Sequence, residues 1–230
     1  MTQDGSNAKA FVLLSGGIDS AVCLQTALDR HDDVEAIHFD YGQQTEAIER
    51  SNAEEQASRA GIPVHISDYR TVFGDFAEGT IEDKSYDSDT TEREGHSVGY
   101  VPQRNLHLLT TAAATAEHNT ETGREIVLYH GAQQGDGEEY PDCRPEFVQA
   151  ATEAINRSTD QHEIDIETPI IDHTKADVLR LGEELGVNWE LTFSCYNDED
   201  GTPCGDCPAC LERKEAFAEV DVADPVLRDR

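Results

Sequence analysis

The sequence has six cysteines, and four of them lie within sixteen residues of one another near its C-terminal end: Cys195, Cys204, Cys207 and Cys210. Four thiolates at such short spacings can bind a tetrahedral zinc ion or an iron–sulfur cluster. A site with four thiolates leaves no open coordination position, so we expect a structural role. The grouping indicates metal binding in a reducing compartment rather than a disulfide framework. Of the two isolated cysteines, Cys23 lies on an apolar helix face and is expected in the core.

A second group of polar residues lies in a short glycine turn near the N-terminus. Residues 15–20 read Ser-Gly-Gly-Ile-Asp-Ser, between an apolar run and a helical pattern. Glycines let backbone amides approach a ligand closely, and the amides at a helix N-terminus bind phosphate. Ser15 and Ser20 add hydroxyl groups. A glycine turn without a ligand is the alternative, but the expected strand and helix on its two sides are the context that a phosphate loop requires. The turn lacks the Gly-Lys-Ser/Thr ending of a Walker A loop.

These two groups need a scaffold, and the hydrophobic pattern predicts one that alternates strands with helices. Short apolar runs predict strands over 10–14, 34–39 and 62–66. Residues 20–29 have helical apolar spacing, and 43–60 form a polar helix ended by Gly61. This rhythm implies right-handed crossovers, a mostly parallel sheet and a doubly wound α/β fold.

Residues 71–99 interrupt this rhythm. They are rich in Asp, Glu, Ser, Thr and Gly, so we interpret them as an insertion or a mobile lid. The pattern then predicts helices over 105–118, 145–157, 175–185 and 210–219, and strands over 125–130 and 164–166. The expected organisation is a nucleotide-binding and catalytic domain over 1–190, a small metal-binding segment with a terminal helix over 191–220, and a frayed tail over 221–230.

The sequence is strongly acidic, with 48 Asp and Glu residues against 17 Lys and Arg residues and a formal net charge of −31. Such self-repulsion is tolerable where salt screens it, so we expect a salt-rich cytoplasm such as that of a halophilic archaeon, with ordinary acidity as the alternative. The charge argues against nucleic acid as a direct partner, because phosphate binding needs clustered Lys and Arg. The chain has no long apolar run and a polar beginning, so we predict no membrane span, no signal peptide and a cytoplasmic location.

Residues 13–20 resemble the pyrophosphate loop of the PP-loop ATP pyrophosphatases, which have an adenine nucleotide alpha hydrolase-like fold. The resemblance implies that ATP transfers AMP to a substrate oxygen and that pyrophosphate leaves. Asp19, beside that pyrophosphate, would be a Mg²⁺ ligand, because this cation prefers oxygen donors. The implied ATP contacts cover the loop and the start of the helix: Leu14, Ser15, Gly16, Gly17, Ile18, Asp19, Ser20, Ala21, Val22, Cys23 and Leu24.

Four further segments resemble one branch of that family, the 7-cyano-7-deazaguanine synthases. They read Phe-Asp-Tyr-Gly-Gln over 39–43, Val-Pro-Gln-Arg-Asn over 101–105, Tyr-Pro-Asp-Cys-Arg-Pro-Glu-Phe over 140–147, and Thr-Phe-Ser-Cys-Tyr over 192–196, which leads into the clustered cysteines, Arg213 and Phe217. One departure is Asp-Gly-Glu-Glu over 136–139, where the family has Asp-Tyr-Ser-Gly. The resemblance favours one structural zinc per chain, on the four clustered cysteines, over an iron–sulfur cluster.

The implied reaction converts 7-carboxy-7-deazaguanine and ammonia into 7-cyano-7-deazaguanine through adenylated intermediates, for archaeosine or queuosine biosynthesis. The catalytic candidates are Asp19 and Ser20 in the loop, with Arg104, Arg144 and Lys175 to orient and stabilise phosphoryl charge. Each of these three cations has an alternative as an ordinary surface side chain.

The residues expected to bind the deazapurine are Tyr41, Gln43, Asp142 and Glu146. One carboxylate could accept both the amide N–H and the exocyclic amine of the base. Asp142 is the first candidate and Glu146 the second, and either could instead be a solvated acid. Cys143 could be a nucleophile, but adenylation does not need one, so we interpret it as a packing residue.

Other functions fit parts of the sequence less well. A tRNA thiolase of the same family would want a basic surface, and an NAD, GMP or asparagine type of synthetase would need a glutaminase domain. A zinc-ribbon interaction module would not need the glycine turn. We therefore expect a ligase that takes small-molecule substrates and binds neither nucleic acid directly nor a membrane, with monomer and homodimer both open.

Overall fold

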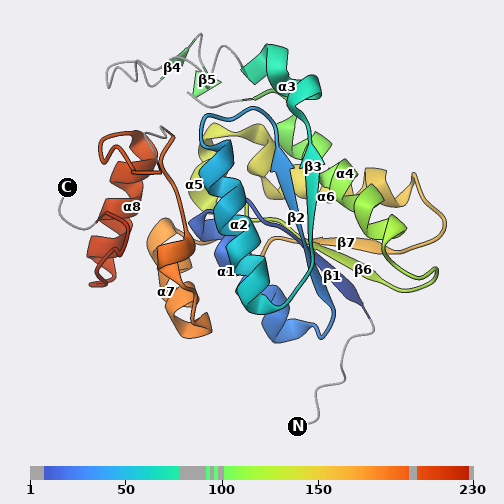
Figure 1. Cartoon of the computed structure of the whole chain (residues 1–230). Helices are drawn as coiled ribbons and strands as arrows, with labels where there is room; N and C mark the ends of the chain where they lie inside the picture. The colour runs from blue at the N-terminus through green and yellow to red at the C-terminus, as the bar shows by residue number, and fades with distance from the viewer. Residues whose placement is uncertain (1–7, 78–91, 94–95, 98–100, 197–200, 228–230) are drawn as a thin grey trace.

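The structure, a computed structural model, describes residues 8–77, 92–93, 96–97, 101–196 and 201–227. Its centre is a parallel sheet of five strands in the order β3-β2-β1-β6-β7 (Figure 1). In chain order the strands are β1 (Lys9–Leu13), β2 (Val34–Asp40), β3 (Val64–Asp68), β6 (Ile126–Tyr129) and β7 (Ile164–Glu167). Ala10 of β1 pairs with Val34 on one side and with Val127 on the other. The strand order reverses between β1 and β6, which places a crevice at the carboxyl ends of these two strands.

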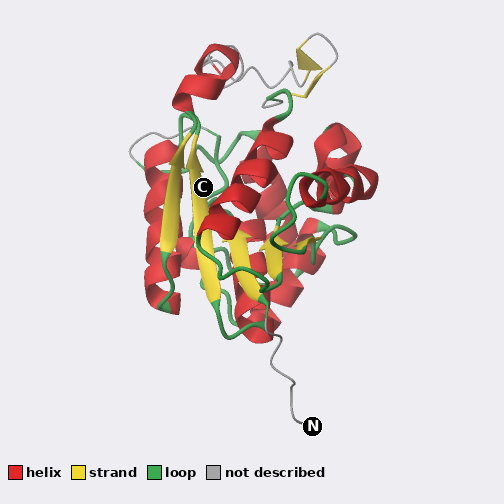
Figure 2. Cartoon of the chain, turned by 90° about the vertical axis from the view of Figure 1, so that its right-hand side faces the viewer, coloured by secondary structure: helices red, strands yellow, loops and turns green. Residues whose placement is uncertain are grey.

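Helices cover both faces of the sheet (Figures 1 and 2). One face carries α1 (Ile18–Arg30) and α2 (Glu46–Ala60), with α7 (Lys175–Leu185) on α1 and α8 (Pro208–Glu219) on α7. The other face carries α4 (Arg104–His118) and α6 (Pro145–Asn156). The shorter elements are α3 (Arg70–Ala77), α5 (Gln134–Glu139), the 3-10 turns η1 (Pro141–Cys143) and η2 (Trp189–Leu191), and the antiparallel pair β4 (Glu92–Arg93) and β5 (His96–Ser97).

Each face of the sheet has its own hydrophobic core, because successive strand residues point to opposite faces. Ala10 and Val12 of β1 pack with α1 and α7, while Phe11 and Leu13 pack with α4 and α6. All five residues of β1 are buried, as expected for the central strand of a parallel sheet covered on both faces.

Local sequence signals set the ends of the helices that surround the crevice. Gly61 and Gly186 end α2 and α7 in the left-handed region, with φ of 70° and 75°. Thr174 begins α7 with a capping box: its side chain accepts from the Asp177 N–H, and the Asp177 side chain accepts from the Thr174 N–H. The capping box sets where α7 begins and places Lys175 at the first position of this helix.

The predicted parallel sheet and its helices are confirmed, with shifts of a few residues at the element ends. The insertion or lid predicted over 71–99 differs at its start, because α3 continues to Ala77 and Phe73 is buried at 2 % exposure. Residues 78–91, 94–95 and 98–99 of that segment lie outside the described residues. The frayed tail predicted from Asp221 is wrong as far as Leu227: Asp224 pairs with Arg213, and Leu227 is buried.

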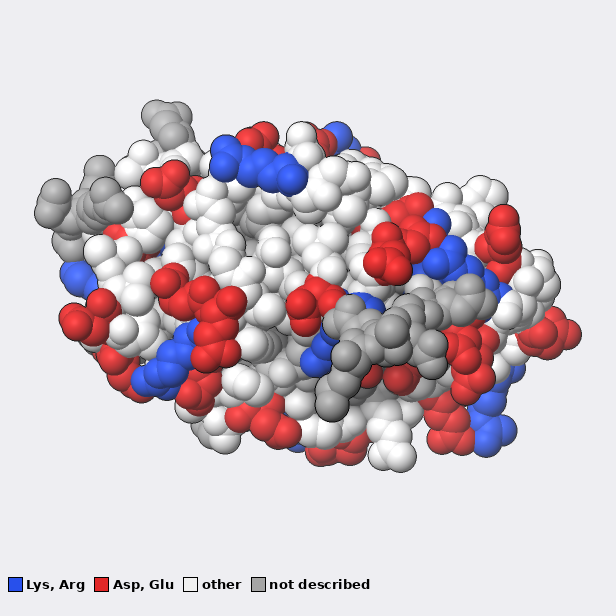
Figure 3. Space-filling view, turned by 90° about the horizontal axis from the view of Figure 1, so that it is seen from below, with Lys and Arg blue, Asp and Glu red and all other residues white. Residues whose placement is uncertain are grey.

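The acidic side chains are distributed over the molecular surface. Figure 3 shows one face, on which Asp and Glu form several groups, with Lys and Arg among them and uncharged residues between the groups. No helix among the described residues is long and apolar enough to span a membrane.

Candidate active site

The phosphate loop, residues 15–20, joins β1 to α1 at the crevice between β1 and β6. Its backbone turns at Gly16, where a φ of +84° favours glycine. The buried Ser20 hydroxyl accepts from the Ser15 N–H at 3.2 Å, donates to the Gly17 carbonyl at 3.2 Å, and lies 3.0 Å from the Ser15 hydroxyl. The first N–H groups of α1 have no partner within the helix, so this end of α1 offers donors to an anion.

Three segments that are distant in the sequence pack around the phosphate loop. A Cβ atom at Gly16 would overlap the Glu49 carbonyl oxygen of α2. The Gly16 carbonyl accepts from the Phe193 N–H at 3.0 Å. A Cβ at Gly131, after β6, would lie 3.3 Å from the Asp19 carbonyl carbon and 3.3 Å from the Ser20 nitrogen. The loop is therefore enclosed by backbone on several sides, and its conformation depends on all three segments.

The apolar residues among the predicted ATP contacts belong to the hydrophobic core. Each of these side chains is at most 3 % exposed, and their contact with ATP stays a prediction: Leu14, Ile18, Ala21, Val22, Cys23 and Leu24. Burial, followed by the Asp19 charge, raises the pKa of the Cys23 thiol far above its usual range. The polar groups of Ser15, Asp19 and the loop backbone remain as the candidates for binding phosphate.

Lys175 and Asp19 form a charged pair at the start of α1. The Lys175 ammonium lies 3.0 and 2.8 Å from the two Asp19 carboxylate oxygens, and 3.8 Å from Glu212 Oε2 of α8. Burial alone would lower the pKa of Lys175, but the carboxylates of Asp19, Glu212 and Asp136 raise it to about 12. Burial and the Asp19 charge raise the pKa of Asp136 to about 6. The structure thus unites two predicted catalytic residues and adds two acids that the sequence did not indicate.

Arg104, the first residue of α4, lies against the end of β2. Its guanidinium carbon is 5.9 Å from the centroid of the Tyr41 ring, which is a cation–π contact. Burial raises the pKa of Tyr41, and the Arg104 charge opposes that rise. Burial lowers the pKa of Arg104, but Tyr41, Cys143, Asp142 and Tyr140 raise it overall. Two predicted residues from different segments, Arg104 and Tyr41, are therefore neighbours, and Arg104 carries a positive charge at every accessible pH.

Asn105 connects the start of α4 to η1. Its backbone N–H donates to Asp142 Oδ2 at 3.1 Å, and its side-chain amide donates to the Asp142 carbonyl at 3.1 Å and to Cys143 Sγ at 3.2 Å. One Asp142 oxygen thus already caps α4, while its role toward the deazapurine stays a prediction. Burial, with the charges of Asp136 and Asp142, raises the pKa of Cys143 to about 12. A protonated, buried thiol agrees with a packing residue rather than a nucleophile.

The other predicted polar residues lie in different settings, and their roles stay predictions. Arg144 begins α6, and its Nε donates to the Gly137 carbonyl at 2.9 Å. Glu146 is exposed in the first turn of α6. Gln43 is buried, and its amide accepts from the Tyr41 N–H at 2.9 Å and donates to Glu49 Oε2 at 3.0 Å. Gln43 therefore shapes the turn after β2 with its own hydrogen bonds.

Two histidines next to the phosphate loop, His38 and His130, belong to no motif in the sequence and could not be predicted from it. His38 of β2 is buried, and its Nδ1 lies 2.8 Å from the Leu14 carbonyl oxygen, directly before the loop. His130 follows β6 and is 9 % exposed, and its Nε2 has no hydrogen-bond partner among the described residues. Burial, followed by the Arg104 charge, lowers the pKa of His130 to about 4. His130 is therefore neutral at physiological pH.

The four clustered cysteines come together as predicted. Their sulfur atoms all lie within 4.8 Å of one another, with 3.4 Å between Cys195 and Cys204, 3.9 Å between Cys195 and Cys207, and 4.0 Å between Cys204 and Cys210. A zinc ion with zinc–sulfur bonds of about 2.3 Å needs sulfur atoms about 3.8 Å apart, so this group fits a tetrahedral metal ion. Gly205, with φ of +83°, makes the turn between Cys204 and Cys207, and Pro208 begins α8.

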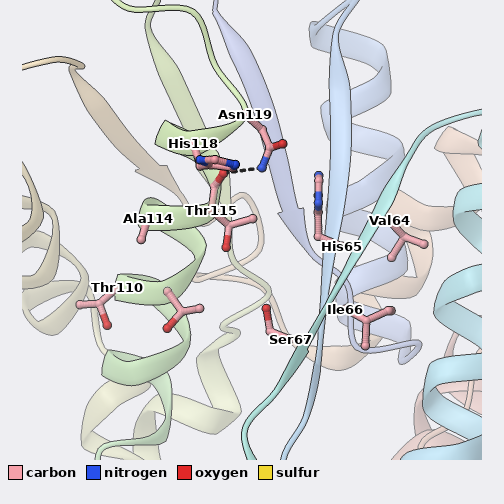
Figure 4. A pocket seen from close by; sticks show the side chains of 10 residues that line it. Val64, His65, Ile66, Ser67, Thr110, Ala114, Thr115, His118 and Asn119 are labelled. Carbon is pink, nitrogen blue, oxygen red and sulfur yellow. Dashed lines mark hydrogen bonds between the residues drawn. The ribbon is translucent and has the colours of Figure 1, made fainter.

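A separate groove of about 760 Å³ lies between β3 and α4 (Figure 4). Its lining mixes polar and apolar side chains and contains no Asp, Glu, Lys or Arg: Val64, His65, Ile66, Ser67, Thr110, Thr111, Ala114, Thr115, His118 and Asn119. None of the predicted site residues lines this groove, so it is distinct from the crevice at the phosphate loop.

The strand order and the glycine loop at the reversal point define a PP-loop, adenine nucleotide alpha hydrolase-like fold. Two solved structures share it. NMN synthetase from Francisella tularensis matches with a TM-score of 0.54 at 15 % identity, over 94 % of this chain and 78 % of that one. A 4-thiouridine synthetase, solved as an RNA complex with bound ATP, matches with a TM-score of 0.51 at 17 % identity, over 93 % of this chain and 50 % of that one. At these identities the likeness concerns the fold alone.

The sequence comparisons define the family. The family model of the queuosine biosynthesis protein QueC matches residues 9–221. The 7-cyano-7-deazaguanine synthase of Methanoculleus marisnigri is 38 % identical over 225 residues, which cover 96 % of this chain and 99 % of the relative. The enzyme of the same name from Archaeoglobus fulgidus is 39 % identical over 226 residues, which cover 96 % and 90 %. The chain belongs to the QueC family of 7-cyano-7-deazaguanine synthases.

Proposed function

We propose that the protein is a ligase that converts 7-carboxy-7-deazaguanine and ammonia into 7-cyano-7-deazaguanine with ATP. The observation that carries this proposal is the phosphate loop at the reversal point of the sheet, with the Asp19–Lys175 pair at the N-terminus of α1. Membership of the QueC family supplies the substrate class.

The chemistry requires activation, because a carboxylate would have to expel oxide. Attack of a carboxylate oxygen on the α-phosphorus of ATP forms a phosphorus–oxygen bond and releases pyrophosphate. Ammonia then attacks the carboxyl carbon, loses a proton, and AMP leaves with the former carboxylate oxygen, which gives the amide. A second ATP activates the amide oxygen in the same way. Loss of AMP and of the remaining amide protons then leaves the nitrile.

The residues of the chain bind and orient in this scheme. The amides at the start of α1 hold the phosphates, and Arg104 next to Tyr41 provides a cation for a carboxylate or a phosphoryl group. The carboxylates of Asp19 and Asp136 lie close enough for Asp19 to raise the pKa of Asp136, and such oxygen donors fit Mg²⁺. When bound there, Mg²⁺ would screen phosphate charge, and Lys175 would keep the Asp19 side chain in position.

The four sulfur donors support zinc as the second metal. Soft thiolates at tetrahedral spacing fit zinc, which would complete a closed structural site and attach the start of α8 to residue 195. The protein would take its substrates as free small molecules, in the cytoplasm of a halophilic cell, with archaeosine in tRNA as the destination of the product. The net charge of −31 supports salt adaptation and disfavours direct binding of nucleic acid.

The test is a product assay with purified protein, ATP, Mg²⁺, ammonia and 7-carboxy-7-deazaguanine in concentrated KCl, with release of pyrophosphate measured in parallel. Asp19→Ala removes a carboxylate next to the expected phosphate site, and Ser20→Ala removes a hydroxyl group that forms hydrogen bonds within the loop. Each substitution should therefore abolish turnover. Arg59→Gln, at an exposed ion pair of α2, serves as the control with full activity. Pyrophosphate release by the wild type without any nitrile product would contradict the proposal.

A further inference from the structure

Arg213 of α8 is a buried cation whose donors are all used. Its side chain is 2 % exposed. Nε and Nη2 donate to the two Asp224 oxygens at 2.8 and 3.0 Å, and the second Nη2 donor is directed to the Trp189 carbonyl at 3.5 Å. Nη1 donates to Thr192 and Ser194. A guanidinium has five N–H donors in a fixed plane, and this arrangement uses that geometry completely.

The Nη1 contacts lie on both sides of Phe193. Nη1 is 3.2 Å from the Thr192 carbonyl oxygen, 3.0 Å from Thr192 Oγ1 and 3.3 Å from Ser194 Oγ. Between these two residues, the Phe193 N–H donates to the Gly16 carbonyl at 3.0 Å. The Phe193 carbonyl oxygen lies 3.5 Å from the position of a Cβ at Gly17. One guanidinium thus holds both neighbours of the residue whose backbone contacts the phosphate loop.

We infer that Arg213, braced by Asp224, is a positioning residue for ATP binding: it fixes segment 192–194, and Phe193 in turn fixes the Gly16 turn of the phosphate loop. This inference rests on the proposed binding of ATP by that loop. Arg213 itself touches no predicted phosphate contact, so it acts through Phe193. Asp224 belongs to the segment beyond α8, which gives the C-terminal residues a part in the geometry of a loop near the N-terminus.

The Arg213→Lys substitution tests whether the geometry of the guanidinium group, and not its positive charge alone, holds segment 192–194 in place. A lysine keeps the positive charge beside Asp224, but its single ammonium cannot reach Asp224, Thr192 and Ser194 in the plane that the guanidinium provides. Arg213→Lys should therefore leave the fold in place and release segment 192–194. The matched control is Arg180→Lys, the same change at an exposed arginine that joins α7 to α8 through Glu219 at 3.0 Å.

The first measurement is calorimetric titration of each full-length variant with a non-hydrolysable ATP analogue and Mg²⁺ in concentrated KCl. If the released loop adopts its binding conformation about one tenth of the time, the Kd of Arg213→Lys rises about tenfold. Arg180→Lys should keep the wild-type Kd. Circular dichroism and the metal content per chain confirm that each variant is folded. An unchanged Kd in folded Arg213→Lys protein would overturn the inference.

The second measurement needs no nucleotide, so it separates this inference from the proposed function. Hydrogen exchange of the amides of residues 14–20 should be faster in Arg213→Lys than in the wild type, and unchanged in Arg180→Lys. Equal exchange in all three proteins would refute the positioning role even if the wild type binds ATP.

If Arg213→Lys does not fold, Ser194→Ala replaces it, since it removes one 3.3 Å contact beside Phe193. Ser194→Ala should weaken analogue binding about threefold without lowering the melting temperature, and wild-type binding would reject the inference.

Discussion

The two adjacent glycines of the phosphate loop should respond very differently to substitution by alanine. Gly16 has φ of +84°, and a Cβ there would overlap the Glu49 carbonyl oxygen and lie 3.2 Å from Asn52 Cβ. Gly17 has φ of −91°, and the nearest atoms to its Cβ position are Ser15 Oγ at 3.4 Å and the Phe193 oxygen at 3.5 Å. Alanine therefore fits the space at Gly17 and does not fit at Gly16.

The magnitude for Gly16→Ala follows from two effects. The left-handed backbone costs an alanine about 1–2 kcal/mol. The overlap is with backbone of α2, which cannot move away as a side chain would, and such overpacking costs about 1–3 kcal/mol. We expect Gly16→Ala to lower the free energy of unfolding by about 2–5 kcal/mol, a large part of the total for a typical domain. Gly17→Ala should change it by less than about 1 kcal/mol, because it adds ordinary van der Waals contacts.

Urea unfolding in concentrated KCl, followed by circular dichroism, gives both free energies under the same conditions. Binding of an ATP analogue is then measured on folded Gly17→Ala protein, because a methyl group at the loop surface should hinder the close approach of phosphate. Equal unfolding free energies for the two variants would refute the assigned turn at Gly16. Full analogue affinity in Gly17→Ala would refute the assignment of this surface to phosphate.

Three further predictions concern pH, metal and salt. His130 has a pKa of about 4 in the fold and about 6.5 when unfolded. As the pH falls, the unfolded chain therefore takes up a proton first, and the free energy of unfolding should decrease by up to about 3 kcal/mol between about pH 6.5 and 4. A His130→Leu variant should lose this part of the pH dependence. Elemental analysis by plasma emission should find one zinc ion per chain, and Cys204→Ser should lower both the zinc content and the melting temperature. Iron with a visible absorption band would contradict the zinc assignment. The melting temperature should rise from about 0.1 M to 3 M KCl, as the Debye length falls to about 3 Å or below, and a flat or falling curve would contradict salt adaptation.

The parts of the site that could be predicted are those written into short stretches of sequence. The phosphate loop needs a strand, two glycines and a helix in immediate succession, and four cysteines in sixteen residues leave few alternatives to a metal. The sheet followed from apolar runs and from the handedness of crossovers. In each case the physical requirement acts within about twenty residues.

The remaining features depend on contacts that no local pattern contains. Gly131 matters because β6 ends against the start of α1, and nothing near Gly131 in the sequence shows that neighbour. Asp136 was one acid among 48, and only the fold brings it near Asp19. The sequence does not indicate helix α3, because the polar composition of 71–99 conceals the buried side chain of Phe73. The tail was expected to fray because a buried partner for Asp224, eleven residues earlier, is invisible without the packing of α8.

The contact between Phe193 and Gly16 also bears on how the protein is made. Synthesis runs from the N-terminus, so the glycine loop leaves the ribosome long before the residue that holds its carbonyl. The partner of β1 on its second side, β6, is also delayed by more than a hundred residues, and such long-range pairing forms slowly. Until then the apolar residues of β1 and α1 have no complete cover, which exposes a nascent chain to chaperones and to aggregation. A chain that stalls before residue 193 would carry the entire loop sequence and still lack the backbone contact that closes it.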